Sequence, residues 1–399
     1  MLRQILWPVL VPSVLFAVGT GATLPVLVVA ALELGANAGQ ASLIVALQGL
    51  VSLLLTVPAG QLIDRIGDRA AMLTATGAAV VVSAAIVVTL VTDPVAALPI
   101  YATCLMLMAP IQNMWGLARQ ALVAETVDPA DVGRAMTLLG GSMRVGRLLG
   151  PLLSAALLLA LPLWTPFVAA AASALLAVGI LFLPAARGLG GATGRRNTGA
   201  PRVKVSRLDV RWPAVFLAGV SVTILAMLRA LNPIIVPLVG VEIGAHASTI
   251  AVLIAVGALV EISLIVPGGY LKDRLGRVAT MVVCLLIFGG GFLMLGAPGG
   301  LGLLVVAVLV MGVGNGLGSG VNMTIGADLS PSQGRPTFLG VWAIFNNAGS
   351  FTGPLAASAL IAAAGIGAAS VATGLIGLAG AAWMLGWARV MGLPGRQSG

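Results

Sequence analysis

The chain has little charge, a single histidine and two cysteines. Charged residues make up 8% of its 399 residues, against about 25% in a typical soluble domain. Because 59% of the residues are hydrophobic, no water-soluble fold could bury so much apolar surface. Cys104 and Cys284 lie in separate apolar segments and His246 has no second histidine nearby, so we expect neither a disulfide framework nor a metal site.

The sequence has no nucleotide-binding motif and no catalytic constellation. We therefore expect neither an enzyme nor an ATP-driven pump, and no cofactor. The net charge of +9 does not indicate nucleic acid, because the basic residues are spread between apolar segments and form no basic face on a soluble domain. Attraction to anionic lipids of the inner leaflet is the expected consequence.

Long apolar stretches dominate the chain. A helix needs roughly 20 apolar residues to cross the bilayer. Twelve stretches are long enough, at 6–32, 40–62, 71–92, 95–118, 136–160, 164–184, 212–239, 248–270, 278–297, 301–325, 336–362 and 367–388. The predicted fold class is therefore all-α, a polytopic membrane protein with twelve transmembrane helices.

The basic residues predict the orientation of these spans. All but three of the 21 Lys and Arg residues fall in predicted loops on one side, Arg119 and Lys272 among them. Loops rich in Lys and Arg stay cytoplasmic. We therefore expect a multi-pass protein of the inner (plasma) membrane with both termini in the cytoplasm. The first apolar run is longer than the 7–15 residues of a signal peptide, so we expect it to be retained as a span.

The chain is predicted to consist of two related halves. The polar stretch 185–211 is read as a cytoplasmic linker between an N-terminal six-helix bundle, 1–184, and a C-terminal six-helix bundle, 212–399. Two short motifs recur at an offset of 209 residues: Glu33–Ala36 with Glu242–Ala245, and Asp64–Gly67 with Asp273–Gly276. Duplicated halves around a mid-membrane site are the architecture of secondary transporters.

A loop rich in glycine and arginine follows the second and the eighth spans. Its residues are Gly60, Asp64, Arg65, Gly67 and Arg69 in the first copy, and Gly269, Asp273, Arg274, Gly276 and Arg277 in the second. Glycine allows a tight turn and close helix approach, and the acid can accept hydrogen bonds from a helix N-terminus or a basic residue. We interpret both loops as latches that hold one conformation and release another.

These loops resemble the signature of the major facilitator superfamily, and the resemblance extends over the twelve spans and the central basic linker. It implies two six-helix bundles, related by pseudo-two-fold symmetry, that rock around a central cavity. The first, fourth, seventh and tenth helices would line that cavity. The second, fifth, eighth and eleventh helices would form the contacts between the bundles.

The fifth span contains Gly141, Gly146, Gly150 and Pro151. This pattern resembles part of the glycine-rich motif of the drug/proton antiporters of that family. Small residues for close packing, with a proline kink, explain it equally well. Those antiporters also have a buried arginine in the fourth helix, whereas here the fourth span has no arginine before Arg119, at its predicted inner end.

Four charged residues interrupt the apolar spans: Arg144, Arg147, Arg229 and Glu261. A charge at the bilayer centre costs on the order of 2.5–3.5 kcal/mol, so such residues usually serve a function. Because the fifth and eighth helices would face each other, we expect Glu261 to pair with Arg144 or Arg147. A proton on Glu261 would then release the arginine. The alternative is a permanent ion pair that locks the bundles together.

Three positive charges against one negative leave room for an anionic substrate held by arginine. Helix C-termini or backbone carbonyls are the alternative partners for these arginines. The expected substrate and coupling residues are Arg144, Arg147, Arg229, Glu261, Gln112, Asn113, Asn232 and Asn346. An inward-facing pocket would also explain Asn315 and Asn322, although some of these polar residues will form ordinary interhelical hydrogen bonds.

The predicted function is secondary active transport: proton-coupled export, by antiport, of a small amphipathic or anionic compound through alternating access. The alternative is an importer or flippase of an anionic metabolite or lipid head group. The paired loops and the mid-membrane charges argue against a membrane receptor that does not transport. The expected partners are the small-molecule substrate, the proton and membrane lipid, with no nucleic acid, and the chain is expected to act as a monomer.

Overall fold

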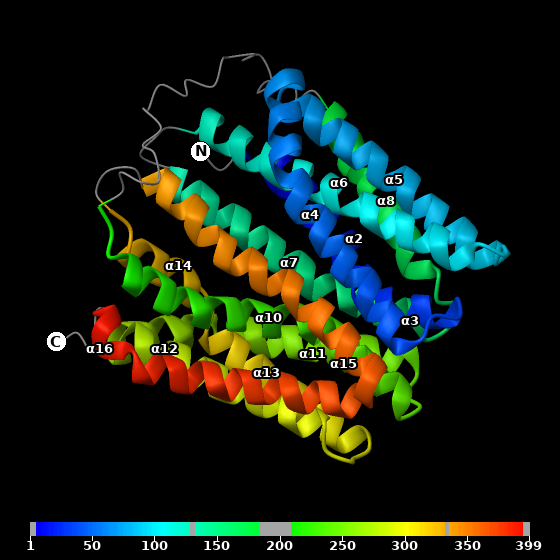
Figure 1. Cartoon of the computed structure of the whole chain (residues 1–399). Helices are drawn as coiled ribbons and strands as arrows, with labels where there is room; N and C mark the ends of the chain where they lie inside the picture. Colours follow the sequence, from blue (N-terminus) through cyan, green and yellow to red (C-terminus); the bar gives the residue numbers. More distant parts are fainter. Residues whose placement is uncertain (1–4, 128–131, 184–208, 332–334, 394–399) are drawn as a thin grey trace. The chain divides into compact units, whose positions relative to one another are not determined.

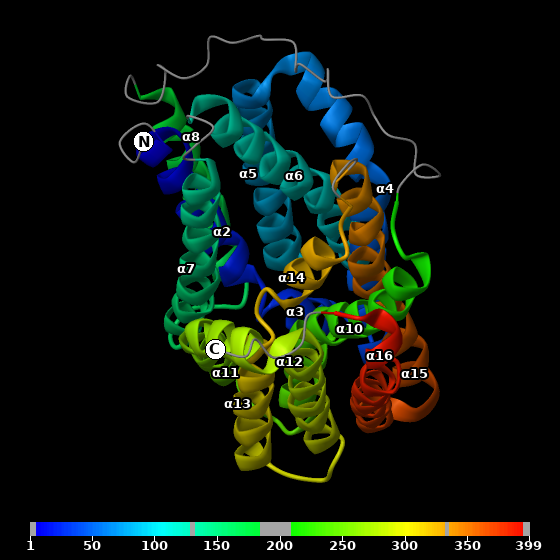
Figure 2. The same ribbon diagram turned by 90° about the vertical axis from the view of Figure 1, so that its left-hand side faces the viewer.

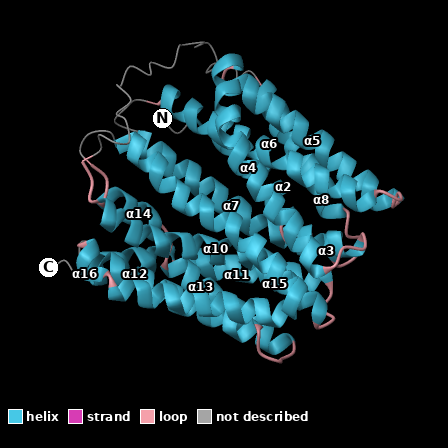
Figure 3. Cartoon of the chain, viewed as in Figure 1, coloured by secondary structure: helices cyan, strands magenta, loops and turns pink. Residues whose placement is uncertain are grey.

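The computed structural model describes residues 5–127, 132–183, 209–331 and 335–393. The predicted linker, 185–211, lies outside these ranges except for its last three residues. Among the described residues the secondary structure is helical throughout, with short connecting loops and no strand (Figure 3). The predicted all-α fold class is therefore confirmed.

The helices of the N-terminal half follow the apolar stretches closely. They are η1 (Leu6–Leu10), α2 (Val11–Thr23), α3 (Leu27–Glu33), α4 (Ala38–Ile66), α5 (Asp68–Thr92), α6 (Ala97–Thr126), α7 (Val132–Leu158) and α8 (Thr165–Phe182). The first three belong to one predicted crossing: η1 runs directly into α2, and a turn at 24–26 separates α2 from α3. The end of α6 lies beyond the predicted end of the fourth span at residue 118, which changes the position assigned to Arg119.

The C-terminal half contains fewer but longer helices. They are α10 (Trp212–Glu242), α11 (Ala247–Ser263), α12 (Ile265–Leu295), α13 (Leu301–Leu317), α14 (Val321–Asp328), α15 (Arg335–Gly386) and α16 (Ala388–Met391). Two of them contain a residue with non-helical backbone, Gly276 in α12 and Gly365 in α15. Each of these glycines ends one membrane crossing and begins the next.

Nine helical stretches in the described ranges are long and apolar enough to span a membrane. The helix α7 is not among them, but its 27 residues reach across a bilayer. The kink in α15 divides one stretch into two crossings, and α11 continues into the first part of α12 as another. Together these helices make the twelve crossings that the sequence predicts.

The internal repeat is visible in the backbone. Gly35 and Gly244 both have positive φ, at +85° and +77°, and each ends a helix with the same pair of hydrogen bonds. Gly67 and Gly276 also match, with φ of +83° and +84°. Equivalent positions of the two halves therefore have the same local conformation. Glycine stands at each of them because it adopts a positive φ without strain.

The chain divides into two compact units. Unit 1 comprises residues 1–37, 47–197 and 246–255, and unit 2 comprises 38–46, 198–245 and 256–399. In unit 1, α2 packs against α7 and α8, and α5 packs against α6 and α8 (Figure 1). In unit 2, α15 packs against α10 and α12, and α13 packs against α12 (Figure 2). The predicted division at 185–211 stays a prediction.

Glycines bring α2 and α7 into backbone contact within unit 1. A Cβ atom placed on Gly150 would lie 2.5 Å from the backbone nitrogen of Ala22, and one on Gly21 would lie 2.9 Å from the carbonyl oxygen of Gly146. Gly146 and Gly150 lie on the buried face of α7, whereas Gly141 is exposed and has open space around it. Close packing therefore accounts for two of the glycines in the motif of the fifth span.

Candidate functional site

Three polar side chains of unit 2, each from a different helix, form a continuous hydrogen-bonded chain. Arg229 of α10 donates from Nε to the Oδ1 atom of Asn315 in α13, at 2.7 Å. Asn315 in turn donates from Nδ2 to the Oε2 atom of Glu261 in α11, also at 2.7 Å. All three side chains are only partly buried. An arginine and a glutamate are therefore joined through one amide, which we call the Arg229–Asn315–Glu261 relay.

The relay lies near the middle of its helices. Arg229 is near the centre of α10, and Asn315 is near the centre of the segment formed by α13 and α14. Glu261 lies midway between Ala247, where α11 begins, and Gly276, where the backbone kinks. The hydrogen-bonded groups therefore lie close to mid-membrane depth, where an ionisable group needs a partner or a function.

Each relay residue lies next to an irregular piece of backbone. The α-helix α11 ends at Ser263, two residues after Glu261, and α13 ends at Leu317, two residues after Asn315. In α10, Pro233 has no N–H to donate to the carbonyl group of Arg229. Interrupted helices at mid-membrane depth occur where the backbone is buried in protein or lines an aqueous cavity, and they mark the substrate and ion sites of transporters.

The chemistry of the two end groups fixes the orientation of Asn315. A guanidinium group can only donate hydrogen bonds, and an ionised carboxylate can only accept them. The amide oxygen of Asn315 must therefore face Arg229, and its NH₂ group must face Glu261. Both bonds polarise the amide in the same direction, so each one strengthens the other.

Glycines allow the relay helices to approach closely enough for these bonds. A Cβ atom on Gly316 would lie 2.7 Å from the carbonyl oxygen of Glu261, and one on Gly312 would lie 2.9 Å from that of Gly257. The backbones of α11 and α13 are therefore in contact beside Asn315. A Cβ atom on Gly318 would collide with the sulfur of Cys284 in α12.

Two cations bind backbone carbonyl groups that directly follow the end of α13 at Leu317. Arg229 donates from Nη2 to the carbonyl oxygen of Gly318 at 3.2 Å, and Lys272 of α12 donates from Nζ to that of Ser319 at 2.9 Å. The C-terminus of a helix attracts cations because its last carbonyls are unsatisfied. Lys272, predicted in a loop, is thus inside α12 and has a structural partner. Gly320, with φ +75°, then lets the chain turn into α14.

In unit 1 the structure corrects the position predicted for Arg119. This residue lies within α6, about two turns before its end at Thr126, and is only 4% exposed. Its guanidinium carbon lies 4.8 Å from the centroid of the Trp115 ring, and its Nη2 atom contacts the sulfur of Met143 in α7. The Nε atom is buried and has no partner in the described part of the chain. Arg119 is therefore a buried arginine of the fourth span.

Trp115 is itself held on both sides. Its ring stacks on Phe16 of α2 with the centroids 4.4 Å apart, and its Nε1 atom donates to the Oγ1 atom of Thr76 in α5 at 2.9 Å. The ring is 1% exposed. Residues of α6 and α7 thus contact the Arg119 guanidinium, and residues of α2 and α5 hold the Trp115 ring in place. The sequence prediction did not include Arg119 among the site residues.

The remaining predicted site residues fall into separate groups. Arg144 and Arg147 are exposed on α7 in unit 1. Because Glu261 belongs to unit 2, its predicted pairing with either arginine joins residues of the two units and stays a prediction. Gln112 and Asn232 are half-buried on α6 and α10, and neither belongs to the relay.

Asn113 and Asn346 take part in local hydrogen-bond networks. Asn113 of α6 donates from Nδ2 to the carbonyl oxygen of Ser52 at 2.7 Å and to Thr56 Oγ1 at 3.0 Å, both on α4. Asn346 of α15 accepts at Oδ1 from Asn322 of α14, at 3.2 Å. Asn113 thus joins two helices of unit 1, and Asn346 joins two of unit 2, as interhelical hydrogen bonds commonly do.

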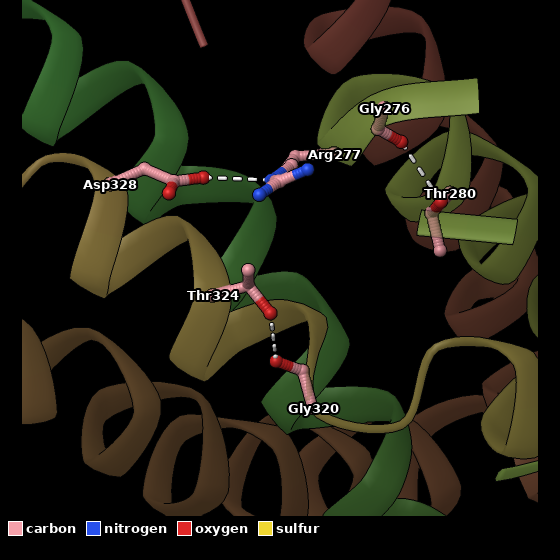
Figure 4. A network of polar contacts seen from close by, with 6 residues as sticks. All are labelled: Gly276, Arg277, Thr280, Gly320, Thr324 and Asp328. Carbon is pink, nitrogen blue, oxygen red and sulfur yellow. Dashed lines mark hydrogen bonds and ion pairs between the residues drawn. The ribbon is translucent and has the colours of Figure 1, made fainter. Parts of the chain in front are cut away.

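The charged residues of the two signature loops differ in their exposure and in their hydrogen-bond partners. In unit 2, Arg277 donates from Nε to the Oδ2 atom of Asp328 at the end of α14, at 2.9 Å (Figure 4). In unit 1, Arg69, the last arginine of the first loop, donates to the carbonyl oxygen of Leu181 in α8, at 2.8 Å. The other charged loop residues are exposed: Asp64, Arg65, Asp273 and Arg274. Each loop is thus bonded within its own unit through its last arginine.

Gly276 should tolerate no side chain, whereas Gly269 of the same loop should tolerate one. Gly276 has φ +84° and ψ 173°, a region that essentially only glycine occupies. We expect Gly276→Ala to lower the free energy of unfolding by about 1–3 kcal/mol. Gly269→Ala is the matched control, because a Cβ atom there meets nothing within 4 Å. Thermal unfolding of the purified variants checks the difference, and equal melting temperatures would contradict it.

Comparison with known proteins gives one family match along the chain. The profile described as Major Facilitator Superfamily matches residues 10–228 and 212–396. An uncharacterized MFS-type transporter of Mycobacterium tuberculosis is 27% identical over 177 residues, which cover 44% of this chain and 31% of that protein. The match thus spans about a third of the relative's length.

Solved structures share the fold at lower sequence identity. A peptide transporter POT in complex with sulfate has a TM-score of 0.78 at 16% identity, covering 98% of this chain and 95% of that one. The human organic anion transporter MFSD10 has a TM-score of 0.64 at 17% identity, covering 96% and 99%. A D-xylose–proton symporter has a TM-score of 0.69 at 14% identity, covering 96% of both chains. At these identities the likeness establishes the fold alone.

Proposed function

The chain belongs to the major facilitator superfamily, and from this premise we propose that it is a proton-coupled secondary transporter that exports a small amphipathic or anionic compound by alternating access. The observation that carries the proposal is the Arg229–Asn315–Glu261 relay at the middle of three spans of unit 2. Glu261 is the acid that would take up the proton, and Arg229 is the charge that responds to it.

Proton uptake by Glu261 would remove the negative charge at one end of the relay. The ionised carboxylate accepts from Asn315, whose oxygen in turn accepts from Arg229. With a neutral carboxyl group, Arg229 keeps its bonds to Asn315 and Gly318 but loses the charge that balances it. An unbalanced charge at this depth favours a different conformation, in which arginine finds another anion or water. This is the step that would couple the proton to transport.

The flanking helix breaks offer a mechanical reason for this coupling. The backbone after Asn315 turns at Gly318–Gly320, and Arg229 and Lys272 both bind carbonyl groups there. Release of Arg229 would remove one of these two cations from the end of α13. A change of charge on Glu261 would thus reach the junction between α13 and α14, which is where the segment can bend.

Export is the direction we propose, and it rests on the likeness of the fifth span to the drug/proton antiporters. Import or flipping of an anionic metabolite or lipid head group is the alternative. Structural neighbours include both an organic anion transporter and a proton symporter. We further propose that the protein lies in the inner (plasma) membrane with both termini in the cytoplasm, and that it acts as a monomer.

Flux into proteoliposomes with an imposed pH gradient tests the proposal. The purified protein is reconstituted, the membrane potential is clamped, and a labelled amphipathic carboxylate such as 1-naphthoate is added outside vesicles with an acidic lumen. Antiport should accumulate the anion in the acidic lumen, because protons leave as the anion enters. Passive weak-acid diffusion drives the anion toward the alkaline side, so the two processes have opposite signs.

Two other results would have distinct meanings. With the anion at equal concentration on both sides at the start, depletion of the acidic lumen faster than in protein-free vesicles would contradict antiport and favour the importing alternative. Facilitated flux that ignores the gradient would contradict proton coupling altogether. Vesicles without protein and vesicles with no gradient are the controls.

A further inference from the structure

We propose that unit 1 contains a binding site for the oxyanion group of an amphipathic organic anion, formed by Arg119 of α6 together with Arg147 of α7. The proposal rests on the proposed transport function, because it names the chemical class of the cargo and the place where its acid group binds. It also moves the expected anion site away from Arg229, whose guanidinium group already has partners in unit 2.

The first observation is a buried charge without a counter-charge. Arg119 is 4% exposed, and among the side chains that the structure describes no carboxylate pairs with it. Its Nε atom is buried without a hydrogen-bond partner. A buried charge is strongly unfavourable unless it is paired and hydrogen-bonded. In unit 2, by contrast, one amide joins Arg229 to Glu261.

The second observation is that the guanidinium group is held in one position. It lies over the Trp115 ring at 4.8 Å, a cation–π contact. The ring cannot easily move, because it stacks on Phe16 and donates a hydrogen bond to Thr76. Donors that are already fixed in place bind a ligand with less loss of conformational entropy.

The third observation concerns the contact at the donor edge of Arg119. Its Nη2 atom points at the sulfur of Met143, and Nε on the same edge has no partner. Thioether sulfur is a weak acceptor on a flexible side chain. A carboxylate, sulfonate or phosphate group could displace it and accept from Nε and Nη2 together, the bidentate geometry in which arginine binds oxyanions.

Arg147 supplies the second charge of the site. It follows Met143 by four residues on α7, so the two side chains lie on the same face of that helix. Met143 contacts Arg119, which places Arg147 beside the same edge. Arg147 is exposed, whereas Arg119 is buried. An arriving anion would thus meet Arg147 first and the Arg119 donor edge second.

Equilibrium binding of 1-naphthoate tests the site without a pH gradient. The whole protein is placed in nanodiscs and dialysed against labelled 1-naphthoate or the neutral analogue 1-naphthylmethanol. We expect the wild type to prefer the anion, and Arg119→Gln to weaken naphthoate binding about 10- to 100-fold while binding of the alcohol stays the same. Arg211→Gln is the control, because Arg211 lies at the start of α10 and bonds to the Met391 carbonyl.

A second variant and a second measurement make the result decisive. Arg119→Lys keeps the positive charge but lacks the pair of parallel N–H donors that bind an oxyanion in bidentate fashion. This variant should therefore bind naphthoate with intermediate affinity. Naphthoate should raise the melting temperature of the wild type but not of Arg119→Gln, whose own melting temperature without ligand shows that it folds. Equal naphthoate affinity in wild type and Arg119→Gln, or no preference of the wild type for the anion over the alcohol, would overturn the proposal.

The binding assay and the flux assay fail independently. Since dialysis imposes no gradient, naphthoate binding that depends on Arg119 stands even if Glu261 carries no proton. Conversely, gradient-driven flux in the wild type together with unchanged binding in Arg119→Gln would leave proton coupling in place and remove only the unit 1 site.

Discussion

Glu261→Gln should abolish accumulation of substrate against its gradient while leaving exchange of substrate across the membrane intact. Glutamine has nearly the same shape as glutamate, and its amide oxygen can still accept the hydrogen bond from Asn315. Glutamine cannot take up a proton and stays neutral at every pH. The relay of this variant therefore lacks the negative charge that balances Arg229. In the proteoliposome assay we expect gradient-driven uptake to fall to the level of protein-free vesicles.

Glu242→Gln is the matched control for this variant. Glu242 is the last residue of α10, exposed and close to the end of its span, where acids are usually solvated. The same substitution there should leave gradient-driven uptake unchanged. If Glu261→Gln still accumulates substrate like the wild type, the relay does not carry the coupling proton. If it loses exchange as well, the defect is in the transport path and not in coupling.

Gly150→Val should prevent unit 1 from folding. A Cβ atom at this position would lie 2.5 Å from two backbone atoms of α2, the nitrogen of Ala22 and the carbonyl carbon of Gly21. Two backbones cannot move apart as a side chain can, so the clash separates α2 from α7 along their whole contact. Overpacking of this kind costs about 1–3 kcal/mol or more. We expect the yield of monodisperse protein after detergent extraction to fall at least about tenfold, a loss on the scale of that energy.

Gly141→Val offers the comparison on the same helix. Gly141 is exposed, and a Cβ atom there meets nothing within 4 Å in the described residues. Its extracted yield and elution profile should match those of the wild type. Equal loss in both variants would mean that valine disfavours α7 in general. A yield of Gly150→Val equal to that of the wild type would contradict the close contact between α2 and α7.

Much of the fold follows from the sequence because hydropathy and glycine act locally. Apolar runs predicted all twelve crossings, since backbone groups in lipid must be satisfied within a helix. The repeat at an offset of 209 residues predicted that Gly67 and Gly276 are equivalent, and both have the same positive φ. The breaks after Ser263 and Leu317 were not predicted, although the sequence carries signals for both: Pro267 cannot donate to the carbonyl group of Ser263, and glycines flank Leu317.

The candidate site was predicted only in part. Glu261 and Arg229 were recognised as charges in apolar spans, but Asn315, which joins them, looked like any other polar residue in a helix. The pairing depends on which faces α10, α11 and α13 turn toward one another, and no local pattern encodes that. A search for polar residues at matching depth in different spans would have found Asn315.

Arg119 was misplaced for a simpler reason. The apolar run of the fourth span ends at Ala118, so the following Arg119 and Gln120 looked like the start of a loop. The helix continues to Thr126 because Leu122 and Val123 are buried against the rest of unit 1. Two more apolar residues at helical spacing after Arg119 were the signal that could have shown it.

Infrared difference spectroscopy of the reconstituted protein tests most directly whether Glu261 is the residue that takes up the proton. Spectra are recorded as the buffer alternates between neutral and acidic, for the wild type, Glu261→Gln and Glu242→Gln. We predict a carboxylic acid band from a partly buried group that is present in the wild type and in Glu242→Gln and missing from Glu261→Gln. The same band in Glu261→Gln would show that another residue takes up the proton.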